Sequence, residues 1–515
     1  MTPLLRPESG LLFPPIPDKQ IDSAISFGHR DGGREMPADG KRLGVQMSKR
    51  IGGVVALAAI CALSLFLLNC GSSSSHPTGI LYVLTQGNNG VGNNVSSFAT
   101  DLNSGNLTLI NSNAATCNPA GASCGPPLDI LLDPAGSNAF VLNQGFFTAS
   151  PPVAPTIFPY TVNSDGSLSA PGMPVTWSCG SGVSSCAYSD NPVAMTSDST
   201  GQFLFVIDQG SFPTPGYPNP SPFPSCPHVP TAENDVCPSI SVFAIKGNTL
   251  TLANGSPSYL SKIPTGLSAV TFTPSGSNSA QELLFVSNNQ DICSQNCIPP
   301  SPHNDNTVSE YIVNSDGSLT EQSNSPYAVA ANNPVSVFAV NVGGTAGGLF
   351  VYVGKSDSNG GDIYPFQVCT VVGNLGCDAQ DVQSNLMTPL QQTCPEPPCN
   401  QVPPSAVGKD PVQMLVDPTQ NFLYVLSEGA NTVYGFQINT SSGTLAAQNP
   451  ANQQTGSQPV SMAIHPSVNN TGQFLYVSNS DSDSISVFPL STTAGSIGSQ
   501  ITVTAPAAPS GLAAH

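Results

Sequence analysis

Seven short apolar strands in this sequence are each followed by polar residues that could bind a ligand. Two positions beyond each strand core stand Thr85, Asn143, Asp208, Asn288, Lys355, Ser427 and Asn479, and the next position holds Gln86, Gln144, Gln209, Asn289, Ser356, Glu428 and Ser480. Amides and hydroxyls at such positions suit hydrogen bonds to a hydroxyl-rich ligand. The candidate binding set taken from them is Asn143, Gln144, Asp208, Gln209, Asn288, Lys355, Glu428 and Asn479. The alternative is that these residues start turns by bonding to nearby backbone.

The sequence assigns no catalytic residue. Hydrolysis of an ester-like bond needs a base and donors that hold the developing oxyanion. His465 stands at a repeated turn position, where we expect a structural role, and scattered serines and aspartates form no legible triad. The acidic turns at Asp481-Ser482-Asp483 and Asp357–Asp362 lack the spacing of a calcium loop. We therefore expect no metal and no cofactor.

Charge restricts the ligands further. Only Lys246, Lys262, Lys355 and Lys409 follow the last arginine, Arg50, and the formal net charge of the chain is −19. Such an acidic body repels phosphate backbones and anionic membranes, so we expect no nucleic-acid partner. Recognition of a phosphorylated ligand would also call for arginine or clustered lysine. The sequence therefore disfavours a phosphorylated ligand.

Twelve cysteines form six close couples in the sequence. They are Cys117 with Cys124, Cys179 with Cys186, Cys226 with Cys237, Cys293 with Cys297, Cys369 with Cys377, and Cys394 with Cys399. The alternative to disulfides is zinc, which usually needs four ligands brought together and is often held by C-x-x-C pairs, a spacing that does not occur here. In an exported chain such couples favour six disulfides.

The segment from residue 47 to residue 70 predicts export. It reads MSKRIGGVVALAAICALSLFLLNC, a basic start followed by an apolar stretch that ends at Cys70. This ending resembles a bacterial lipoprotein signal, in which the cysteine is acylated and becomes the mature N-terminus. Ordinary secretion and an uncleaved anchor remain as alternatives. Residues 1–46 are interpreted as a misassigned start or a disordered extension, and 71–78 as a Ser-rich linker. The expected location is the bacterial cell envelope, with membrane contact only through the lipid.

Internal repeats position the polar residues. The buried core of one strand recurs seven times, at Leu81-Tyr82-Val83, Ala139-Phe140-Val141, Leu204-Phe205-Val206, Leu284-Phe285-Val286, Val351-Tyr352-Val353, Leu423-Tyr424-Val425 and Leu475-Tyr476-Val477. Each is followed by a strand of the form Val-x-x-Phe and, in several copies, by a glycine-containing turn typical of hairpins. With 48 Gly, 50 Pro and 8% charged residues, the composition also favours an all-β chain.

The repeats predict seven four-stranded blades over residues 79–515. The strands of each blade are named a to d from the innermost to the outermost. A full a-strand precedes only six of the strand cores, and Pro509–Ala514 resembles the missing copy. We therefore expect the C-terminal strand to close the ring inside the first blade, which removes two exposed sheet edges. The b–c and d–a connections carry the long insertions, so we expect their face to bind ligands.

The repeat Pro-Val-x-Met, Phe-Leu-Tyr-Val, Asn-Thr-Val-x-x-Phe and Ser-Gly-Thr-Leu of residues 411–445 resembles the lactonase-like propellers and the YVTN-repeat proteins. The resemblance implies a seven-bladed β-propeller and, as one possibility, hydrolysis of a lactone such as 6-phosphogluconolactone. The arginines with which the family holds anionic substrates have no counterpart after Arg50. Two hypotheses follow: an exported, lipid-anchored binding or scaffold protein for a small molecule, glycan or protein, and a lactone hydrolase.

Overall fold

The computed structural model describes residues 79–86, 94–115, 125–145, 154–176, 191–210, 238–260, 262–274, 279–291, 306–330, 333–342, 348–358, 360–372, 377–392, 400–465 and 473–515. The chain divides into two compact units, Met1–Ser73 and Ser74–His515, and all described residues belong to the second. The predicted signal with Cys70 lies outside the described residues.

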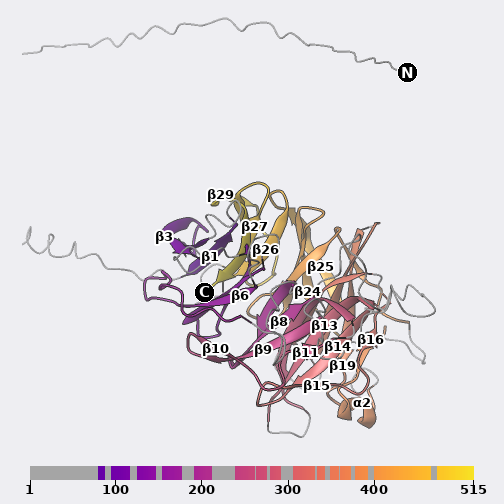
Figure 1. Ribbon diagram of the computed structural model, residues 1–515. Helices are drawn as coiled ribbons and strands as arrows, with labels where there is room; N and C mark the ends of the chain where they lie inside the picture. The colour runs from indigo at the N-terminus through magenta and orange to yellow at the C-terminus, as the bar shows by residue number, and fades with distance from the viewer. Residues whose placement is uncertain are drawn as a thin grey trace, which may run out of the picture. The chain divides into compact units, whose positions relative to one another are not determined.

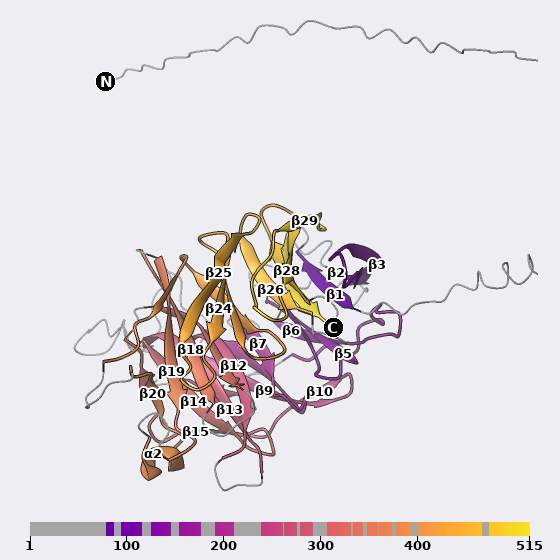
Figure 2. The same cartoon turned by 180° about the vertical axis from the view of Figure 1, so that it is seen from behind.

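Seven antiparallel sheets form the blades of a propeller (Figures 1 and 2). The inner strands are β30 (Pro509–Ala514), β4 (Pro127–Leu132), β7 (Pro192–Ser197), β12 (Lys262–Phe272), β17 (Pro334–Asn341), β22 (Pro411–Val416) and β26 (Pro459–Ile464). Next come β1 (Ile80–Thr85), β5 (Asn138–Asn143), β8 (Phe203–Asp208), β13 (Gln281–Asp291), β18 (Leu349–Asp357), β23 (Phe422–Ser427) and β27 (Gln473–Asn479). These b-strands contain all seven predicted strand cores.

The outer strands complete the blades. The c-strands are β2 (Asn94–Thr100), β6 (Thr156–Thr161), β9 (Ser239–Lys246), β14 (Thr307–Val313), β19 (Gly360–Val368), β24 (Thr432–Ile438) and β28 (Ser484–Leu490). The outermost are β3 (Leu107–Ala115), β10 (Thr249–Leu252), β15 (Leu319–Glu321), β20 (Met387–Pro389), β25 (Leu445–Gln454) and β29 (Ile501–Thr504). Three short strands, β11 (Ser258–Tyr259), β16 (Tyr327–Ala328) and β21 (Ser405–Val407), add further pairs to c-strands, and helix α2 (Ala379–Gln383) precedes β20.

The predicted closure of the ring is confirmed. Strand β30 pairs antiparallel with β1, and Leu512 lies opposite Val83. The C-terminus accordingly lies beside the indigo strand β1 in both views (Figures 1 and 2). The first and last segments of the propeller therefore share one sheet.

The second blade departs from the predicted four strands. Within the described residues its sheet contains only β4, β5 and β6. The segment that follows β6 makes isolated bridges, from Leu168 to Val162 just beyond β6 and from Val175 to Ile157 in β6. Pro171 and Pro174 lie between these bridges and lack the N–H groups that a ladder needs. Up to residue 176, where the described segment ends, an irregular segment thus stands in place of the fourth strand.

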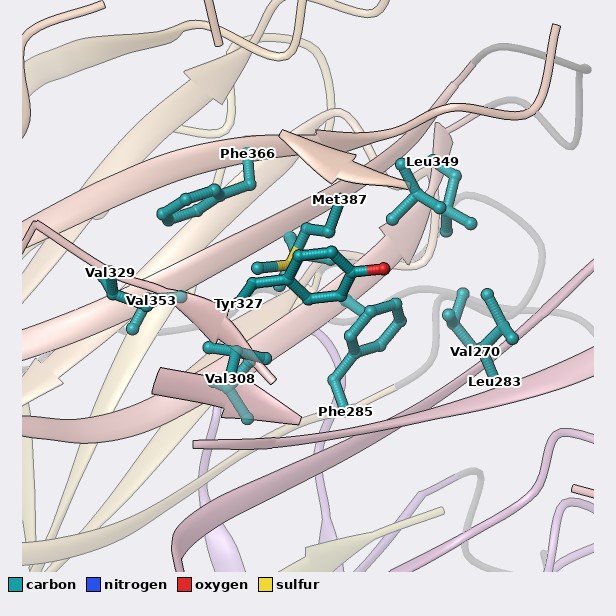
Figure 3. Packing of buried hydrophobic residues seen from close by; sticks show 14 of the residues in the cluster. Val270, Leu283, Phe285, Val308, Tyr327, Val329, Leu349, Val353, Phe366 and Met387 are labelled. Atoms are coloured by element: carbon teal, nitrogen blue, oxygen red, sulfur yellow. The ribbon is translucent and has the colours of Figure 1, made fainter. Parts of the chain in front are cut away.

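The core lies between the blades. Each of seven buried clusters combines side chains from two neighbouring sheets, so the propeller has seven apolar layers in place of one centre. In the layer between the fourth and fifth blades, Phe285, Tyr327, Leu349 and Met387 pack together (Figure 3). Burial of such side chains is worth about 1.5–3 kcal/mol each.

This layer also contains a carboxyl group. Glu310 on β14 lies directly opposite Phe285 and is 0% exposed. Neither of its carboxyl oxygens has a hydrogen-bond partner of normal geometry in the described part of the chain. Burial raises the pKa of Glu310 to about 8, and the Tyr327 hydroxyl beside it lowers the pKa only in part.

The repeated Phe-x-Tyr sequence of the b-strands joins neighbouring blades. The phenylalanine packs on the hairpin glycine of the next blade, as Phe350 does on Gly443 and Phe422 on Gly495, whose positive φ values of 69° and 65° favour glycine. In two copies the tyrosine hydroxyl donates to the carbonyl of that same glycine, at 2.9 Å from Tyr352 to Gly443 and 2.8 Å from Tyr424 to Gly495. Tyr82, which has Ile80 in place of the phenylalanine, makes the equivalent bond to Gly166 at 3.0 Å.

Candidate functional site

Every inner strand begins with the same irregularity. A proline at or near the start of the strand pairs with the rim residue two positions beyond the b-strand core, and the pairing then skips one residue. These prolines are Pro127, Pro192, Pro264, Pro334, Pro411, Pro459 and Pro509, of which Pro264 is the third residue of β12 and the others are the first of their strands. A β-bulge of this kind bends the strand and redirects a side chain. Six of the skipped residues line the central channel of the propeller, namely Leu128, Val193, Thr265, Val412, Val460 and Ser510.

Several of the predicted rim residues that stand two positions beyond a strand core form hydrogen bonds to side chains of the neighbouring c-strand. Asn479 is 0% exposed and donates from its amide to the hydroxyls of Ser484 and Ser486 at 3.2 and 3.0 Å. Asn288 is 1% exposed and reaches Thr307 and Ser309 in the same way, at 3.3 and 3.1 Å. These amides fix the start of the b–c turns of their blades.

Asn143 and Asp208 occupy the equivalent position in the second and third blades. Asn143 is 0% exposed, and its amide donates to the Thr156 hydroxyl at 3.4 Å. Asp208 is 1% exposed and accepts the N–H groups of Asn191 and Gly210 at 2.9 and 2.7 Å. The structure therefore places these four candidate residues beneath the surface of the rim.

Most of the predicted rim residues one position further along the chain are partly exposed, and they connect neighbouring loops through hydrogen bonds. The side-chain amide of Gln209 donates to the Pro264 carbonyl of the next blade at 3.0 Å. Gln458, which precedes the next inner strand, donates from its amide to the Asp481 carboxylate in the neighbouring b–c turn at 2.7 Å. Gln144 is half-buried, and its N–H donates to the Pro126 carbonyl at 2.9 Å.

The backbone N–H groups of these same residues form hydrogen bonds that join the b–c loop to the d–a loop at the base of both loops. The N–H of Glu428 donates to the Asp410 carbonyl at 2.9 Å, and Ser480 bonds to Gln458 at the same distance. Equivalent bonds start at Gln86, Gln144, Gln209 and Ser356. In each of these six blades, one hydrogen bond joins the beginning of the b–c loop to the end of the d–a loop.

Lys355 is the only basic residue of the candidate set, and it is already paired. Its ammonium lies 2.8 Å from Asp357 and 3.3 Å from Asp362, with 13% of its side chain exposed. The carboxylate partners raise the pKa of Lys355, so it stays protonated. Because two carboxylates surround one ammonium, this part of the rim attracts no additional anion.

The inner edges of the seven blades surround a channel of about 720 Å³. Hydroxyl groups of Thr196, Thr265, Ser268, Ser336, Ser461, Ser480 and Ser510 line it, together with apolar side chains and three glutamines. Asp129 on β4 is the only charged residue among the described residues of the lining. The channel therefore has an uncharged polar surface with a single carboxyl group.

Several lining residues satisfy the unpaired edges of the inner strands. An inner edge strand exposes N–H and C=O groups that need partners. Gln413 accepts the Met462 N–H at 2.6 Å, and Ser461 accepts the Leu512 N–H at 3.2 Å. Hydroxyls also donate across blades, at 3.0 Å from Ser510 to Pro127, 2.9 Å from Thr265 to Pro334 and 2.6 Å from Ser336 to Pro411.

Asp129 occupies the position equivalent to Gln413 and Ser461, directly after the bulge. Its carboxylate accepts the N–H of Ile130 at 2.8 Å and the N–H of Met195 in the next blade. Burial raises the pKa of Asp129 to about 6, and these two hydrogen bonds lower it only in part. The aligned blades show why this residue stands out, because the equivalent positions hold Ala194, Gly266, Ser336, Gln413, Ser461 and Gly511.

A second hollow of about 440 Å³ lies between the sixth and seventh blades. It is lined by Asn431, Gln454, Thr455, Gly456, Ser457, Ser482, Ser484, Gln500 and Thr502. Its serines belong to the same network as Asn479, since Ser484 also contacts the Ser482 hydroxyl at 2.9 Å. This hollow contains no charged residue in its described lining.

One of the six cysteine couples falls within the described residues, and it forms the predicted disulfide. Cys369 and Cys377 are bonded, with a Cα–Cα distance of 5.6 Å. The other five predicted disulfides lie outside the described residues and stay predictions. They are Cys117 with Cys124, Cys179 with Cys186, Cys226 with Cys237, Cys293 with Cys297, and Cys394 with Cys399.

Metal-binding clusters and membrane-spanning helices are both absent from the described residues. Among these residues, no group of three or more histidine, cysteine, aspartate or glutamate side chains could hold a metal ion. The described ranges also contain no helix long and apolar enough to cross a membrane.

Comparison with known proteins confirms the predicted resemblance. Residues 396–511 match the family model described as a lactonase seven-bladed β-propeller. A candidate 6-phosphogluconolactonase from Bacteroides fragilis is similar in structure, with a TM-score of 0.52 and 13% identity over 86% of this chain and 99% of that chain. The periplasmic gluconolactonase of Pseudomonas aeruginosa has the same TM-score and identity, over 84% and 98%. No curated protein matches in sequence. At 13% identity, the similarity to these two structures shows a shared fold alone.

Proposed function

We propose that this protein is an exported, lipid-anchored binding protein that holds a small polar ligand without a phosphate group at the loop-bearing end of its channel. The observation that carries the proposal is the charge of this end. Lys355 is paired with two carboxylates, and the described channel lining contains one carboxyl group and no cation. Amides and hydroxyls line the same channel and suit an uncharged, hydroxyl-rich ligand.

A phosphorylated lactone fits this site poorly. Its phosphate would need cationic donors, and it would meet Asp129 inside the channel and Glu428 near its mouth. We therefore expect the purified full-length protein to hydrolyse 6-phosphogluconolactone no faster than buffer does. The assay should include Lys355→Ala, which we expect to behave like the unchanged protein. Turnover at about 1–10³ s⁻¹ that is lost in Lys355→Ala would contradict the proposal.

Hydrolysis of an unphosphorylated lactone is the second candidate function. Asp129 favours it, because a channel carboxyl group with a pKa of about 6 could activate water near neutral pH. The similarity to a periplasmic gluconolactonase is in keeping with this chemistry. Gluconolactone hydrolysis that disappears in Asp129→Asn would favour the enzyme, whereas reversible binding without turnover would favour the binding protein.

A further inference from the structure

Asp129 is a carboxylate with no counter-ion among the described residues of the channel. The described channel lining contains no lysine, arginine or histidine. The strands packed against β4 are β1, β5, β7 and β30. They carry one titratable side chain, Tyr82, whose hydroxyl donates to the Gly166 carbonyl. Nothing in the described channel lining therefore neutralises Asp129.

The channel thus favours a cation. A charged group out of bulk water is stabilised by an opposite charge, because the local interaction is stronger than in water. The net charge of the chain, −19, adds a negative potential that concentrates cations in a cleft. Two backbone N–H groups hold the Asp129 carboxylate in place, so an arriving cation meets an oriented acceptor.

The other residues that line the channel indicate which groups the ligand carries besides its cation. Hydroxyls of Thr265, Ser480 and Ser510 and the amides of Gln86 and Gln458 lie along the described lining, with apolar side chains between them. Hydroxyl and amide groups can both donate to and accept from ligand hydroxyls. A volume of about 720 Å³ lies within the range of small-molecule sites.

We propose that the ligand of the channel is an amino alcohol or amino sugar, whose ammonium pairs with Asp129 and whose hydroxyls bond to the polar lining. This proposal rests on the proposed binding function and names the ligand class for the same site. It does not require turnover, and no bond forms or breaks.

Calorimetry with glucamine and sorbitol tests it. These probes differ only in an ammonium in place of one hydroxyl, so the comparison isolates the charge. For the purified full-length protein at pH 7.5, we expect glucamine to bind at least tenfold more tightly than sorbitol. Asp129→Asn should remove this difference. Asp316→Asn, which removes an exposed carboxylate from a c–d turn outside the channel lining, should change the glucamine Kd less than threefold.

The pH dependence of binding provides a readout that needs no variant. Because Asp129 takes up a proton as the pH falls below about 6, glucamine affinity should decrease there, while sorbitol affinity should stay constant. If sorbitol binds as tightly as glucamine, the ammonium assignment is wrong and the proposed binding function stands. If Asp129→Asn, folded as judged by thermal unfolding, binds glucamine unchanged, the assignment is also wrong. If neither probe binds, both proposals are overturned.

Discussion

Two regions of the propeller bury a carboxyl group in different ways. Asp129 lies in the channel, where it accepts two backbone N–H groups and remains open to solutes. Glu310 lies between the fourth and fifth blades, is 0% exposed, and has no hydrogen-bond partner of normal geometry for its oxygens in the described structure. Burial raises the pKa of both groups, to about 6 and about 8. The first carboxyl group can be neutralised by a ligand, whereas the second can be neutralised only by a proton.

Removing the closing strand should have the largest effect. Deletion of residues 506–515 takes away β30, which pairs with β1 and packs against β4. Leu512 is buried, and loss of one such side chain costs about 2–5 kcal/mol. We expect unfolding in denaturant to lose its single cooperative transition. An unchanged midpoint and slope would contradict this role of β30.

The same deletion tests the comparison between the two acids. Loss of β30 should open the channel beside Asp129 and bring the pKa of that group toward its ordinary value. Glu310 lies in a layer that β30 does not contact, so its pKa should stay high in any folded fraction. Carboxyl chemical shifts measured across a pH titration would show whether only Asp129 responds.

Glu310→Gln should produce the next largest effect. The folded protein retains the proton of Glu310 up to about pH 8, whereas the unfolded chain releases it near pH 4.5. The unfolding free energy should therefore be highest below pH 4.5 and fall as the pH rises to about 8. Glutamine cannot ionise, so the variant should be more stable than the natural protein by up to roughly 3 kcal/mol at pH 7.

Denaturant unfolding at pH 4.5, 6, 7 and 8 measures this difference. The matched control is Glu321→Gln on the neighbouring strand β15, where the side chain is exposed. We expect the control to follow the natural protein at every pH. Equal stability of Glu310→Gln and the natural protein at pH 8 would show that water reaches Glu310.

Asp129→Asn should give the smallest change of the three. The raised pKa of Asp129 makes stability fall between about pH 4 and pH 6 and stay level above. Solvent in the channel screens the charge, so the variant should gain only roughly 1–2 kcal/mol at pH 7. Saturating glucamine should raise the unfolding temperature of the natural protein and leave that of the variant unchanged. If glucamine raised the unfolding temperature of both proteins, its binding would not depend on Asp129.

The fold could be predicted because each blade carries its own signals. Strand cores such as Leu423-Tyr424-Val425 repeat in register, and the copy missing before Leu81 reappears at Leu512. The second blade could not be predicted fully, because Pro171 and Pro174 interrupt a strand whose loss the repeat pattern conceals.

The site was harder to predict because its hydrogen bonds cross between strands and blades. Polarity after a strand made Asn288 and Asn479 candidates, yet their amides meet hydroxyls of the next strand. Gln209 bonds to a carbonyl of the following blade, which spacing within one repeat does not reveal. Asp129 was missed, although alignment of the seven inner strands sets it apart as the only charged residue at its position.

The hydrogen bond at the base of the loops has a consequence for how such proteins can diversify. The bond from Gln209 to Asn191 lies at the base of a b–c connection of residues 209–238, and the bond from Ser480 to Gln458 lies at the base of one of only residues 480–483. Both have normal lengths, 3.0 and 2.9 Å. Loop length is thus uncoupled from the scaffold, so new recognition loops can be inserted or exchanged without redesigning the strands that carry them.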